Sequence, residues 1–305
     1  MKELLDQVIE EAGRIIVGKE QTLRLALTCM LANGHLLIED LPGVGKTTLA
    51  HTLAKLVGLQ YQRIQFTSDL LPADIIGVSV YHRGDETFQF HQGPIFTQLL
   101  LADEINRATP KAQSALLEAM EERQVTTDGK TRALPQPFFV IATQNPAHQI
   151  GTFPLPESQL DRFLMRLHID YPDEAAERIL LSGEDRRHLL EQMNPCLTIE
   201  QLKQLQQQVP RIHVADALLD YIQDLLKFSR TSPRFNHGLS PRAGLALINS
   251  ARAWALQAGH QEVLPEDVQA VLAATVGHRL HSSGDTGIDE GSSLAQFLLQ
   301  SVPLP

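Results

Sequence analysis

The stretch from Asp40 to Thr48, Asp-Leu-Pro-Gly-Val-Gly-Lys-Thr-Thr, constrains this chain more than any other part of it. It follows an apolar run at residues 35–39 and precedes a segment of helical character at 47–57. A strand, a glycine-rich turn, a Lys-Thr pair and a helix in this order are typical of a phosphate-binding loop. The two glycines let backbone N–H groups converge on phosphate oxygens, and the dipole of the following helix adds to the positive field.

We therefore predict that most residues of this loop bind a nucleotide. They are Pro42, Gly43, Val44, Gly45, Lys46, Thr47 and Thr48. Lys46 is expected to reach the β- and γ-phosphates, and the Thr47 hydroxyl is expected to complete the coordination shell of a bound Mg²⁺. Asp40 stands where the usual pattern has a glycine. That departure leaves a chance Gly-Lys-Thr in a loop as the alternative interpretation.

A second motif ends an apolar run, residues 96–102, in two carboxylates, Asp103 and Glu104. Ligands of parallel sheets bind at the carboxyl ends of the strands, so Asp103 is predicted to hold Mg²⁺ beside Thr47. Glu104 is the candidate for polarising a water that attacks the γ-phosphate. The alternative is that the two acidic residues cap the helix that follows the strand.

Three further polar residues are candidates for the same site. Asn145 follows an apolar run at 138–142, where its amide could bond the γ-phosphate and the attacking water, although Asn-Pro also begins turns. Arg162 ends the segment 155–163, and its alternative role is a surface ion pair. Arg242 falls in the first turn of a predicted helix that Ser240 caps.

The pattern of apolar residues predicts two parts in the chain. Residues 1–171 alternate strands and helices, which implies an α/β domain with a doubly wound parallel sheet. Two insertions with near-alternating apolar residues, about 78–92 and 124–134, are predicted to be hairpins. Residues 172–305 have helical periodicity, which predicts a smaller all-α lid domain with a C-terminal tail.

The expected elements have the following bounds. Strands are predicted at 35–39, 60–65, 99–103, 138–142 and 166–169. Helices are predicted at 174–181, 198–208, 214–228, 241–257, 265–276 and 294–299, with a mobile connection at 281–293.

Charge, apolar content and cysteine spacing limit the kinds of partner and compartment that we expect for this chain. The net charge is −10 and the basic residues are dispersed, which disfavours nucleic acid as a partner. No apolar run approaches the roughly 20 residues that span a bilayer, so membrane insertion is not expected. Cys29 and Cys196 have no metal or redox spacing, which favours a cytoplasmic protein with free thiols.

The order of these motifs resembles that of AAA+ ATPases, and several segments resemble the MoxR family in particular. These segments are 65–75, 102–108, 113–122 and 155–163. The resemblance runs from about Val17 to Pro305, and it accommodates Asp40 because the family tolerates a non-glycine residue there. It implies an AAA+ αβα domain with a lid, ATP or ADP and Mg²⁺ as ligands, and hydrolysis of ATP.

The same resemblance implies roles for individual residues. Ile16, Val17 and Gly18 would contact the adenine, and Asn145 would be sensor 1. Arg242 would be sensor 2, which touches the γ-phosphate from the lid. Arg162 would be an arginine finger that reaches the nucleotide of the neighbouring subunit.

The resemblance also implies a chaperone-like remodelling or assembly factor for protein clients. Such a protein would form a homo-oligomeric ring, expected to be a hexamer, and would work with a partner that carries a von Willebrand factor A domain. The hairpins would lie near the central pore, with Val80, Tyr81 and Phe88 as candidates for client contact; otherwise they are surface decoration. Two alternatives stay open: a nucleic-acid-stimulated motor, disfavoured by the charge, and a scaffold with little turnover, disfavoured by Glu104.

Overall fold

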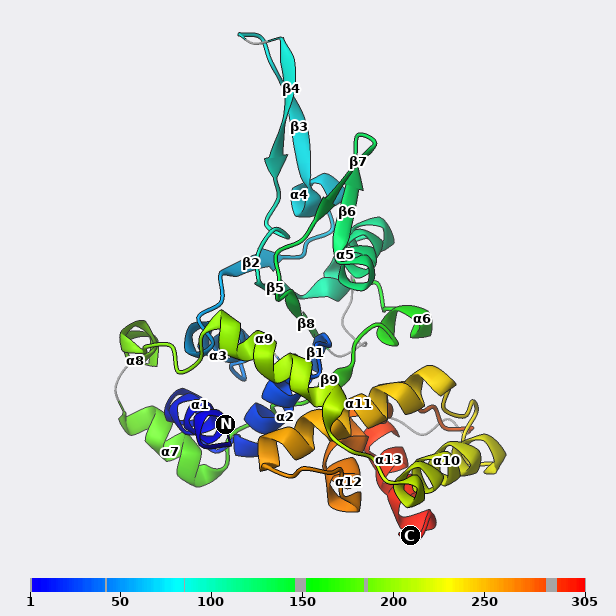
Figure 1. The fold of residues 1–305 in the computed structure, drawn as a ribbon. Coiled ribbons are helices and arrows are strands. Elements are labelled where there is room, and N and C mark those ends of the chain that lie inside the picture. Colours follow the sequence, from blue (N-terminus) through cyan, green and yellow to red (C-terminus); the bar gives the residue numbers. More distant parts are fainter. Residues whose placement is uncertain are drawn as a thin grey trace.

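The computed structural model describes residues 2–41, 43–84, 86–145, 152–183, 186–283 and 290–304. Within them, five parallel strands form the central sheet in the order β2-β5-β8-β1-β9 (Figure 1). The strands are β1 (Leu36–Glu39), β2 (Tyr61–Gln65), β5 (Leu99–Asp103), β8 (Phe139–Gln144) and β9 (Met165–Leu167). The predicted doubly wound parallel sheet is confirmed, and each strand lies within two residues of its predicted bounds.

Helices cover the sheet and continue beyond it. Up to the last strand they are α1 (Lys2–Ile15), α2 (Glu20–Leu31), α3 (Lys46–Leu56), α4 (Pro72–Ile76), α5 (Pro110–Glu122) and α6 (Glu157–Leu160). After it come α7 (Glu174–Ser182), α8 (Arg186–Gln192), α9 (Ile199–Gln208), α10 (Asp216–Thr231), α11 (Pro241–Ala258), α12 (Pro265–Val276) and α13 (Glu290–Ser301). Short 3₁₀ turns lie at Ile105–Arg107, Val209–Arg211 and Gly277–Arg279.

The apolar strands are buried on both faces, as expected in the middle of a parallel sheet. All five residues of β5 are buried. Leu99 and Leu101 belong to one hydrophobic cluster, with α1 and α3, whereas Leu100 and Ala102 belong to another, with α5. Alternate side chains of the strand therefore pack into two separate hydrophobic layers, one on each face of the sheet.

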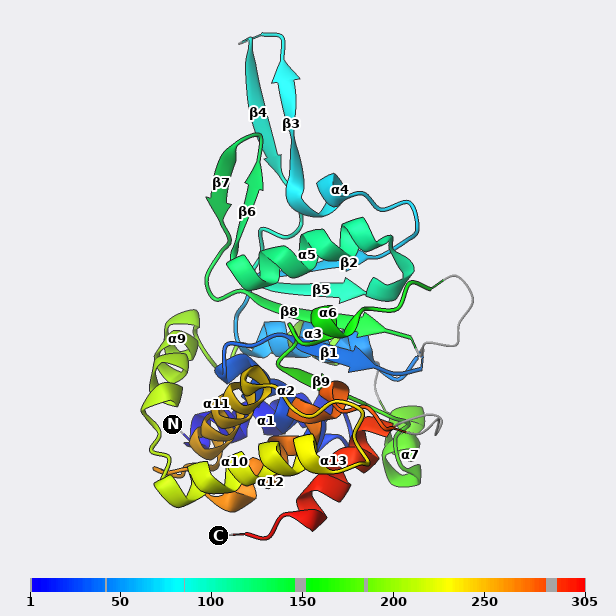
Figure 2. The ribbon, with the colours of Figure 1, turned by 90° about the vertical axis from the view of Figure 1, so that its right-hand side faces the viewer.

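The helical part shares a core with the sheet. The first of these clusters extends from Leu5 in α1 to Val302 after α13. α11 packs against α12, α2 and α1, and α12 packs against β9. Figure 2 shows α5 beside β2 and β5, and α2, α11 and α12 beyond β9, at the opposite edge of the sheet. The division at residues 171 and 172 therefore stays a prediction, because one cluster crosses it.

Both predicted hairpins are present. They are β3 (Gly77–His82) with β4 (Thr87–Gln92), and β6 (Gln124–Thr127) with β7 (Lys130–Ala133). Asp128 and Gly129 join β6 to β7 with φ angles of 53° and 70°, as a two-residue primed turn requires. Both hairpins project from the edge of the sheet away from the helical part (Figures 1 and 2).

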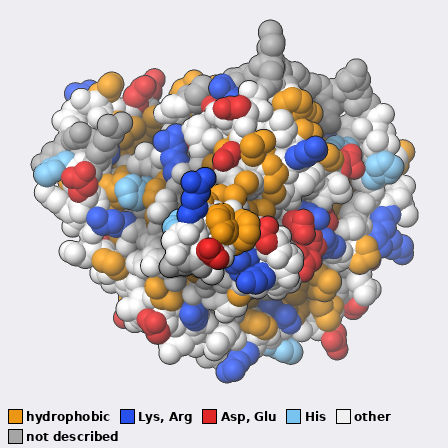
Figure 3. Space-filling model, turned by 90° about the horizontal axis from the view of Figure 1, so that it is seen from above, with side chains coloured by type: hydrophobic (Ala, Val, Ile, Leu, Met, Phe, Trp, Pro, Cys, Tyr) orange, Lys and Arg blue, Asp and Glu red, His pale blue; other side chains and the backbone are white. Residues whose placement is uncertain are grey.

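The two hairpins touch each other. Ser79 Oγ lies 2.5 Å from Asp128 Oδ2, and the Arg132 guanidinium lies 3.8 Å from the centroid of the Phe90 ring. Val80, Tyr81 and Phe88 are exposed large apolar residues on β3 and β4. Figure 3 looks down on this end of the molecule, where hydrophobic side chains gather near the middle of the face.

Some elements were not predicted individually. α8 is short and rich in charged and polar residues, so it gives no helical apolar pattern. α13 is longer than the predicted 294–299, and much of the predicted mobile connection at 281–293 lies outside the described residues. In the part of the chain that the structure describes, no helix is both long and apolar enough to span a bilayer.

A buried histidine at the start of β1 makes folding stability depend on pH. Burial lowers the pKa of His35 from 6.5 to about 4. The ring accepts a hydrogen bond from Val140 N at Nδ1 (3.0 Å), so Nε2 is the nitrogen that donates to Met120 O (3.2 Å). Since the folded state resists protonation, this contribution is complete above pH 6.5 and is lost as the pH falls toward 4, by up to about 3 kcal/mol.

We therefore expect the free energy of unfolding to decline between pH 6.5 and 4 less steeply in His35→Gln than in the wild type. Glutamine can donate to Met120 O and accept from Val140 N without titrating. Denaturant titrations across this pH range measure the difference, with exposed His188→Gln as the control. Identical pH profiles for wild type and His35→Gln would contradict the assignment.

Candidate active site

The phosphate loop is open where a phosphate would bind. Gly43 and Gly45 have φ angles of 91° and 98°, and a Cβ built on either would meet no atom within 4 Å. Gly45 lies at the N-terminus of α3, so the loop and the helix dipole converge on the same space. These features fit a bound phosphate group. Pro42 lies outside the described residues.

Lys46 begins α3 and is buried beside the loop. Its Nζ donates to Asp40 O at 2.6 Å and to Asn145 Oδ1 at 3.3 Å. Burial lowers the pKa of Lys46, and the nearby carboxylates of Asp40, Asp103 and Glu104 oppose that shift. The ammonium group therefore lies among acceptors that phosphate oxygens can replace. Thr47 and Thr48 follow it in the first turn of α3.

Asp40, the departure from the usual loop pattern, fixes the loop to the sheet. Its Oδ2 accepts hydrogen bonds from Ile169 N (2.6 Å) and Asp170 N (2.7 Å), and its Oδ1 accepts one from Leu41 N (2.8 Å). The side chain is buried. At the position where the usual pattern has a glycine, the Asp40 carboxylate thus connects the start of the loop to the chain after β9.

Asp40→Gly restores the usual residue but removes this connection. We expect it to lower the free energy of unfolding by about 2–3 kcal/mol, because the backbone N–H groups of Ile169 and Asp170 lose a charged acceptor. Urea titration measures the loss. Asp40→Asn keeps one acceptor oxygen and should lose less. Equal stability of Asp40→Gly and wild type would show that the connection contributes nothing.

Asp103 ends β5 and is oriented by two residues that the sequence analysis did not identify. Its Oδ1 accepts from Thr143 Oγ1 at 2.6 Å, and its Oδ2 accepts from Arg63 Nη2 at 2.7 Å. Thr143 Oγ1 also accepts from Glu104 N at 2.8 Å. Thr143 and Arg63 therefore set the orientation of the carboxylate predicted to hold Mg²⁺.

Glu104 follows with a left-handed backbone, φ 57°, and does not cap a regular helix. Its Oε1 accepts from Asn145 Nδ2 at 2.9 Å, and its Oε2 accepts from Gln65 Nε2 at 2.8 Å. Arg107 lies 3.2 Å from Oε2. Hydrogen bonds thus join Glu104, Asn145 and Lys46, three residues that the sequence analysis assigned to one site, beside the phosphate loop.

A cavity of about 390 Å³ continues from the phosphate loop. Val17, which the resemblance implies as an adenine contact, lines it, whereas Gly18 lines a different cavity. A Cβ on Gly18 would come within 2.9 Å of Ala176 Cβ, so this glycine allows the loop after α1 to approach α7. Ile16, which the resemblance implies as an adenine contact together with Val17, lines this cavity too. Apolar residues that the sequence analysis did not assign to the site also line it: Tyr171, Pro172, Leu180 and Leu181.

Arg162 and Arg242 lie together and share a carboxylate. Arg162 Nη1 donates to Leu117 O (2.8 Å) and lies 2.9 Å from Glu121 Oε2. Arg242 Nη2 lies 3.5 Å from Glu121 Oε1, and its Nε lies 3.5 Å from Asp161 Oδ2. Arg162 Nη1 makes both of these contacts, so Glu121 and Leu117 hold the guanidinium through this one nitrogen.

This pair is separated from the phosphate loop of its own chain. Both arginines line a cavity with Gly34 and His35, which precede β1, whereas Lys46 lies beyond the carboxyl end of β1. The implied contact between Arg242 and the γ-phosphate in its own chain is therefore not present in this structure. Helix α11, which carries Arg242 in its first turn, packs on α2 and α12.

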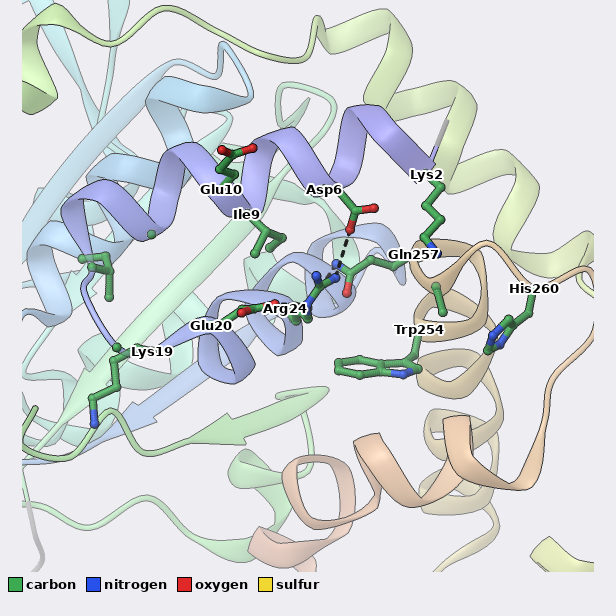
Figure 4. Close-up of a pocket in the computed structure, with 14 residues that line it drawn as sticks. Lys2, Asp6, Ile9, Glu10, Lys19, Glu20, Arg24, Trp254, Gln257 and His260 are labelled. Carbon is green, nitrogen blue, oxygen red and sulfur yellow. Dashed lines mark hydrogen bonds and ion pairs between the residues drawn. The ribbon is translucent and has the colours of Figure 1, made fainter. Parts of the chain in front are cut away.

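A larger cavity, about 1020 Å³, lies elsewhere in the structure. It lies among α1, α2 and α11, beside Trp254, the single tryptophan (Figure 4). Arg24 pairs with two of its carboxylates and lies 3.3 Å from Asp6 and 2.9 Å from Glu20. The glycines of the phosphate loop line the smaller cavity, which is therefore the candidate nucleotide site.

Known proteins resemble the chain over its whole length. The family described as "ATPase family associated with various cellular activities (AAA)" matches residues 35–165, and an AAA lid domain matches 227–295. Chaperone MoxR1 of Mycobacterium tuberculosis is 41% identical over 99% of this chain and 82% of its own length. Protein MoxR of Paracoccus denitrificans is 33% identical over 88% of this chain and 86% of its own. The chain belongs to the MoxR family of AAA+ ATPases.

A solved structure agrees with this MoxR assignment. A protein from Cytophaga hutchinsonii, described as a candidate ATPase, superposes with a TM-score of 0.88 and 34% identity over 100% of this chain and 96% of its own. Another relative, protein YeaC of Bacillus subtilis, is 42% identical over 99% of this chain and 95% of its own.

The MoxR site contains residues that a closer look at β2 could have found. Arg63 and Gln65 alternate with the buried Ile64, so both point to one face at the carboxyl end of the strand. That position placed them next to Asp103 and Glu104. No such signal existed for Glu121, which looks like one of several acidic residues on the exposed side of α5.

Proposed function

We propose that this MoxR chain hydrolyses ATP with Mg²⁺ and uses the reaction to remodel or assemble protein clients. The observation that carries the proposal is the hydrogen-bonded row of Lys46, Asn145 and Glu104 at the mouth of an open phosphate loop. A cation, an amide and a carboxylate in this order suit phosphate binding, water placement and water activation, respectively. The membership of an ATPase family supports the same reaction.

In this proposal each residue acts on one part of the substrate. Lys46 and the loop N–H groups bind the phosphates, and Thr47 and Asp103 would hold Mg²⁺, which supplies charge neutralisation. Asn145 orients the attacking water, and Glu104 accepts its proton. Arg63 and Thr143 keep Asp103 in place. The apolar cavity beyond the loop takes the base, with Val17 on one wall.

The remaining positive charge would come from a neighbouring subunit. Near Asp103 and Glu104, Arg63 and Arg107 already lie against carboxylates. Arg162 and Arg242 lie at the other end of β1 and face away from their own loop. We propose that both reach the neighbour's nucleotide, Arg162 as the arginine finger and Arg242 beside it. An arginine finger accelerates hydrolysis by about 10³–10⁵, so a lone protomer should be slow.

Clients would meet the projecting hairpins. Tyr81 and Phe88 face each other across β3 and β4 with ring centroids 5.3 Å apart, and both are exposed. Exposed apolar side chains at the end of a projection suit transient contact with unfolded or partly folded protein. A homo-oligomeric ring, with six subunits as the expected number, would gather several hairpins around one opening. A von Willebrand factor A domain protein is the proposed partner, and the two free cysteines suit a cytoplasmic setting.

We expect Tyr81→Ser and Phe88→Ser to weaken binding of an unfolded test protein, reduced and carboxymethylated lactalbumin, by about tenfold. Each change removes an apolar contact worth about one to two kcal/mol. Fluorescence anisotropy of the labelled test protein measures this. Exposed Leu304, far from the hairpins, provides the control variant Leu304→Ser. Unchanged binding in both hairpin variants would contradict a client role for this surface.

The proposed reaction is tested by steady-state ATP hydrolysis as a function of protein concentration, with and without single- and double-stranded DNA. The proposal predicts a specific rate that rises with concentration and does not respond to DNA. A rate per protomer that is constant over all concentrations would contradict a shared active site. Strong stimulation by DNA would contradict the assignment to protein clients.

A further inference from the structure

The 3₁₀ turn at Gly277–Arg279 holds the segment of the chain that carries Arg162. The side chains of His278 and Arg279 lie mostly inside the protein and reach the same carbonyl group. His278 Nε2 donates to Phe163 O at 3.1 Å, and Arg279 Nη2 donates to Phe163 O at 2.9 Å. Two neighbouring residues of the turn therefore fix the backbone directly after Arg162.

Arg279 uses all three of its guanidinium nitrogens on this segment. Its Nε donates to Asp161 Oδ1 at 2.6 Å, and its Nη1 donates to Leu164 O at 3.4 Å. Its Nη2 donates to Asp161 O at 3.3 Å as well as to Phe163 O. These acceptors lie on both sides of Arg162 in the chain, so one planar group holds the backbone around it. A lysine ammonium is a point charge on a flexible stem and cannot reproduce this geometry.

Asp161 also connects Arg279 to Arg242. Oδ1 of Asp161 accepts from Arg279, whereas Oδ2 lies 3.5 Å from Arg242 Nε. Arg242 and Arg162 in turn share Glu121. The side chain of Arg279 is 8% exposed, whereas those of Arg162 and Arg242 are 31% and 54% exposed. Because a buried charge must keep its partner, the ion pairs are held most firmly at Arg279.

Helices α12 and α13 hold the turn from its other side. The turn follows α12 directly and packs against α13. Gly277 in the turn and Gly291 in α13 approach each other so closely that a Cβ on Gly291 would collide with Gly277 O. The turn is therefore a fixed part of the fold, against which Arg279 can orient other side chains.

We propose that Arg279 is a positioning residue for Arg162 and Arg242. It fixes the backbone that carries Arg162, and it orients the Arg242 guanidinium through Asp161. The inference rests on the proposed function, in which both arginines act on the nucleotide of the neighbouring subunit. In this role Arg279 makes no contact with nucleotide, so its loss should slow hydrolysis in the neighbour's site and leave ATP binding in its own site unchanged.

Arg279→Lys keeps the charge and loses the planar group. We expect it to lower the maximal rate of ATP hydrolysis per protomer by about ten- to a hundredfold, because small misplacements of positioned groups cost up to about a hundredfold. The ATP affinity of the dilute protomer should stay that of the wild type. Arg211→Lys, at an exposed arginine of the 3₁₀ turn Val209–Arg211, is the matched control and should change neither value. A wild-type rate or a lowered ATP affinity in Arg279→Lys would overturn the inference.

Mixing with Glu104→Gln protomers separates positioning from a general loss of structure. Arg279→Lys protomers keep their own ATP site, and Glu104→Gln protomers supply correctly placed arginines. Equal amounts should recover about one quarter of the wild-type activity, since half of the sites belong to Arg279→Lys protomers and half of these face a neighbour of the other kind. A variant that had merely lost its fold would not recover.

Arg162→Ala in the same mixture keeps this inference apart from the proposed function. Recovery with Arg162→Ala but not with Arg279→Lys would overturn the inference and leave the shared site in place. Absence of recovery with either variant would overturn the shared site, and the inference with it.

Asp161→Asn tests the same connection at its partly exposed carboxylate. The amide loses the charge that pairs with Arg279 and Arg242, so this variant should show the same lowered rate, unchanged ATP affinity and recovery on mixing. The double variant with Arg279→Lys should lose less than the product of the two single losses, because both changes break one connection. Losses that multiply in full would mean that Arg279 does not act through Asp161, and would overturn the inference.

Discussion

Lys46→Ala should remove tight ATP binding. The Lys46 ammonium lies beside the open loop, where it donates to Asp40 O and Asn145 Oδ1. Its replacement removes charge-assisted hydrogen bonds to the phosphates worth about 1.5–3 kcal/mol each, which corresponds to a loss in affinity of about a hundredfold or more. Equilibrium binding of a fluorescent ATP analogue measures the change.

Lys55→Ala is the matched control for this variant. Lys55 lies at the other end of α3 and donates to Glu191 O, outside the site. Its truncation should leave ATP affinity unchanged. Retained affinity in Lys46→Ala, with Lys55→Ala behaving as the wild type, would mean that the phosphate loop is misassigned.

Glu104→Gln should bind ATP with near-normal affinity and hydrolyse it about 10²–10⁴ times more slowly. The amide has nearly the shape of the carboxylate, and it still accepts a hydrogen bond from Asn145 Nδ2, but it cannot take a proton from the attacking water. Single-turnover phosphate release separates hydrolysis from binding. Glu122→Gln on α5 is the control, because that exposed side chain lies at the end of the helix and outside the site. Normal turnover in Glu104→Gln would place the general base elsewhere.

The sequence patterns were sufficient to predict the parallel sheet and to place Lys46, Asp103 and Asn145 at the same edge of it. The apolar runs before Lys46, Asp103 and Asn145 are strands buried on both faces, and such runs are hard to mistake. Their carboxyl ends meet at one edge of a parallel sheet, so the polar residues after them had to converge. The hairpin around Asp128 and Gly129 was equally local, because the turn residues specify their own backbone angles.

Other features depended on packing between distant segments. Asp40 looked like a departure from a motif, and its partners at Ile169 and Asp170 are more than a hundred residues away. Arg242 was expected over its own nucleotide, but the orientation of α11 is set by its contacts with α2 and α12. Helix spacing describes which face of α11 is apolar, and it does not say against which helix that face packs.

The contact that Arg162 and Arg242 share with Glu121 also changes which subunit's nucleotide the two arginines are expected to reach. A lid arginine that touches its own nucleotide would report the nucleotide state within one subunit. Two arginines that share Glu121 at the other end of β1 would instead report it to the subunit next door. The rate of hydrolysis then depends on contact between subunits, and Glu121 is a positioning residue for both guanidiniums.

The most direct test of a site shared between subunits is a mixing experiment with two inactive variants. Glu104→Gln protomers have a dead site and intact arginines, whereas Arg162→Ala protomers have an intact site and lack the finger. Random assembly of equal amounts should restore about one quarter of the wild-type activity, because half of the intact sites would face an intact finger. Activity in the mixture no greater than the average of the two variants alone would contradict it.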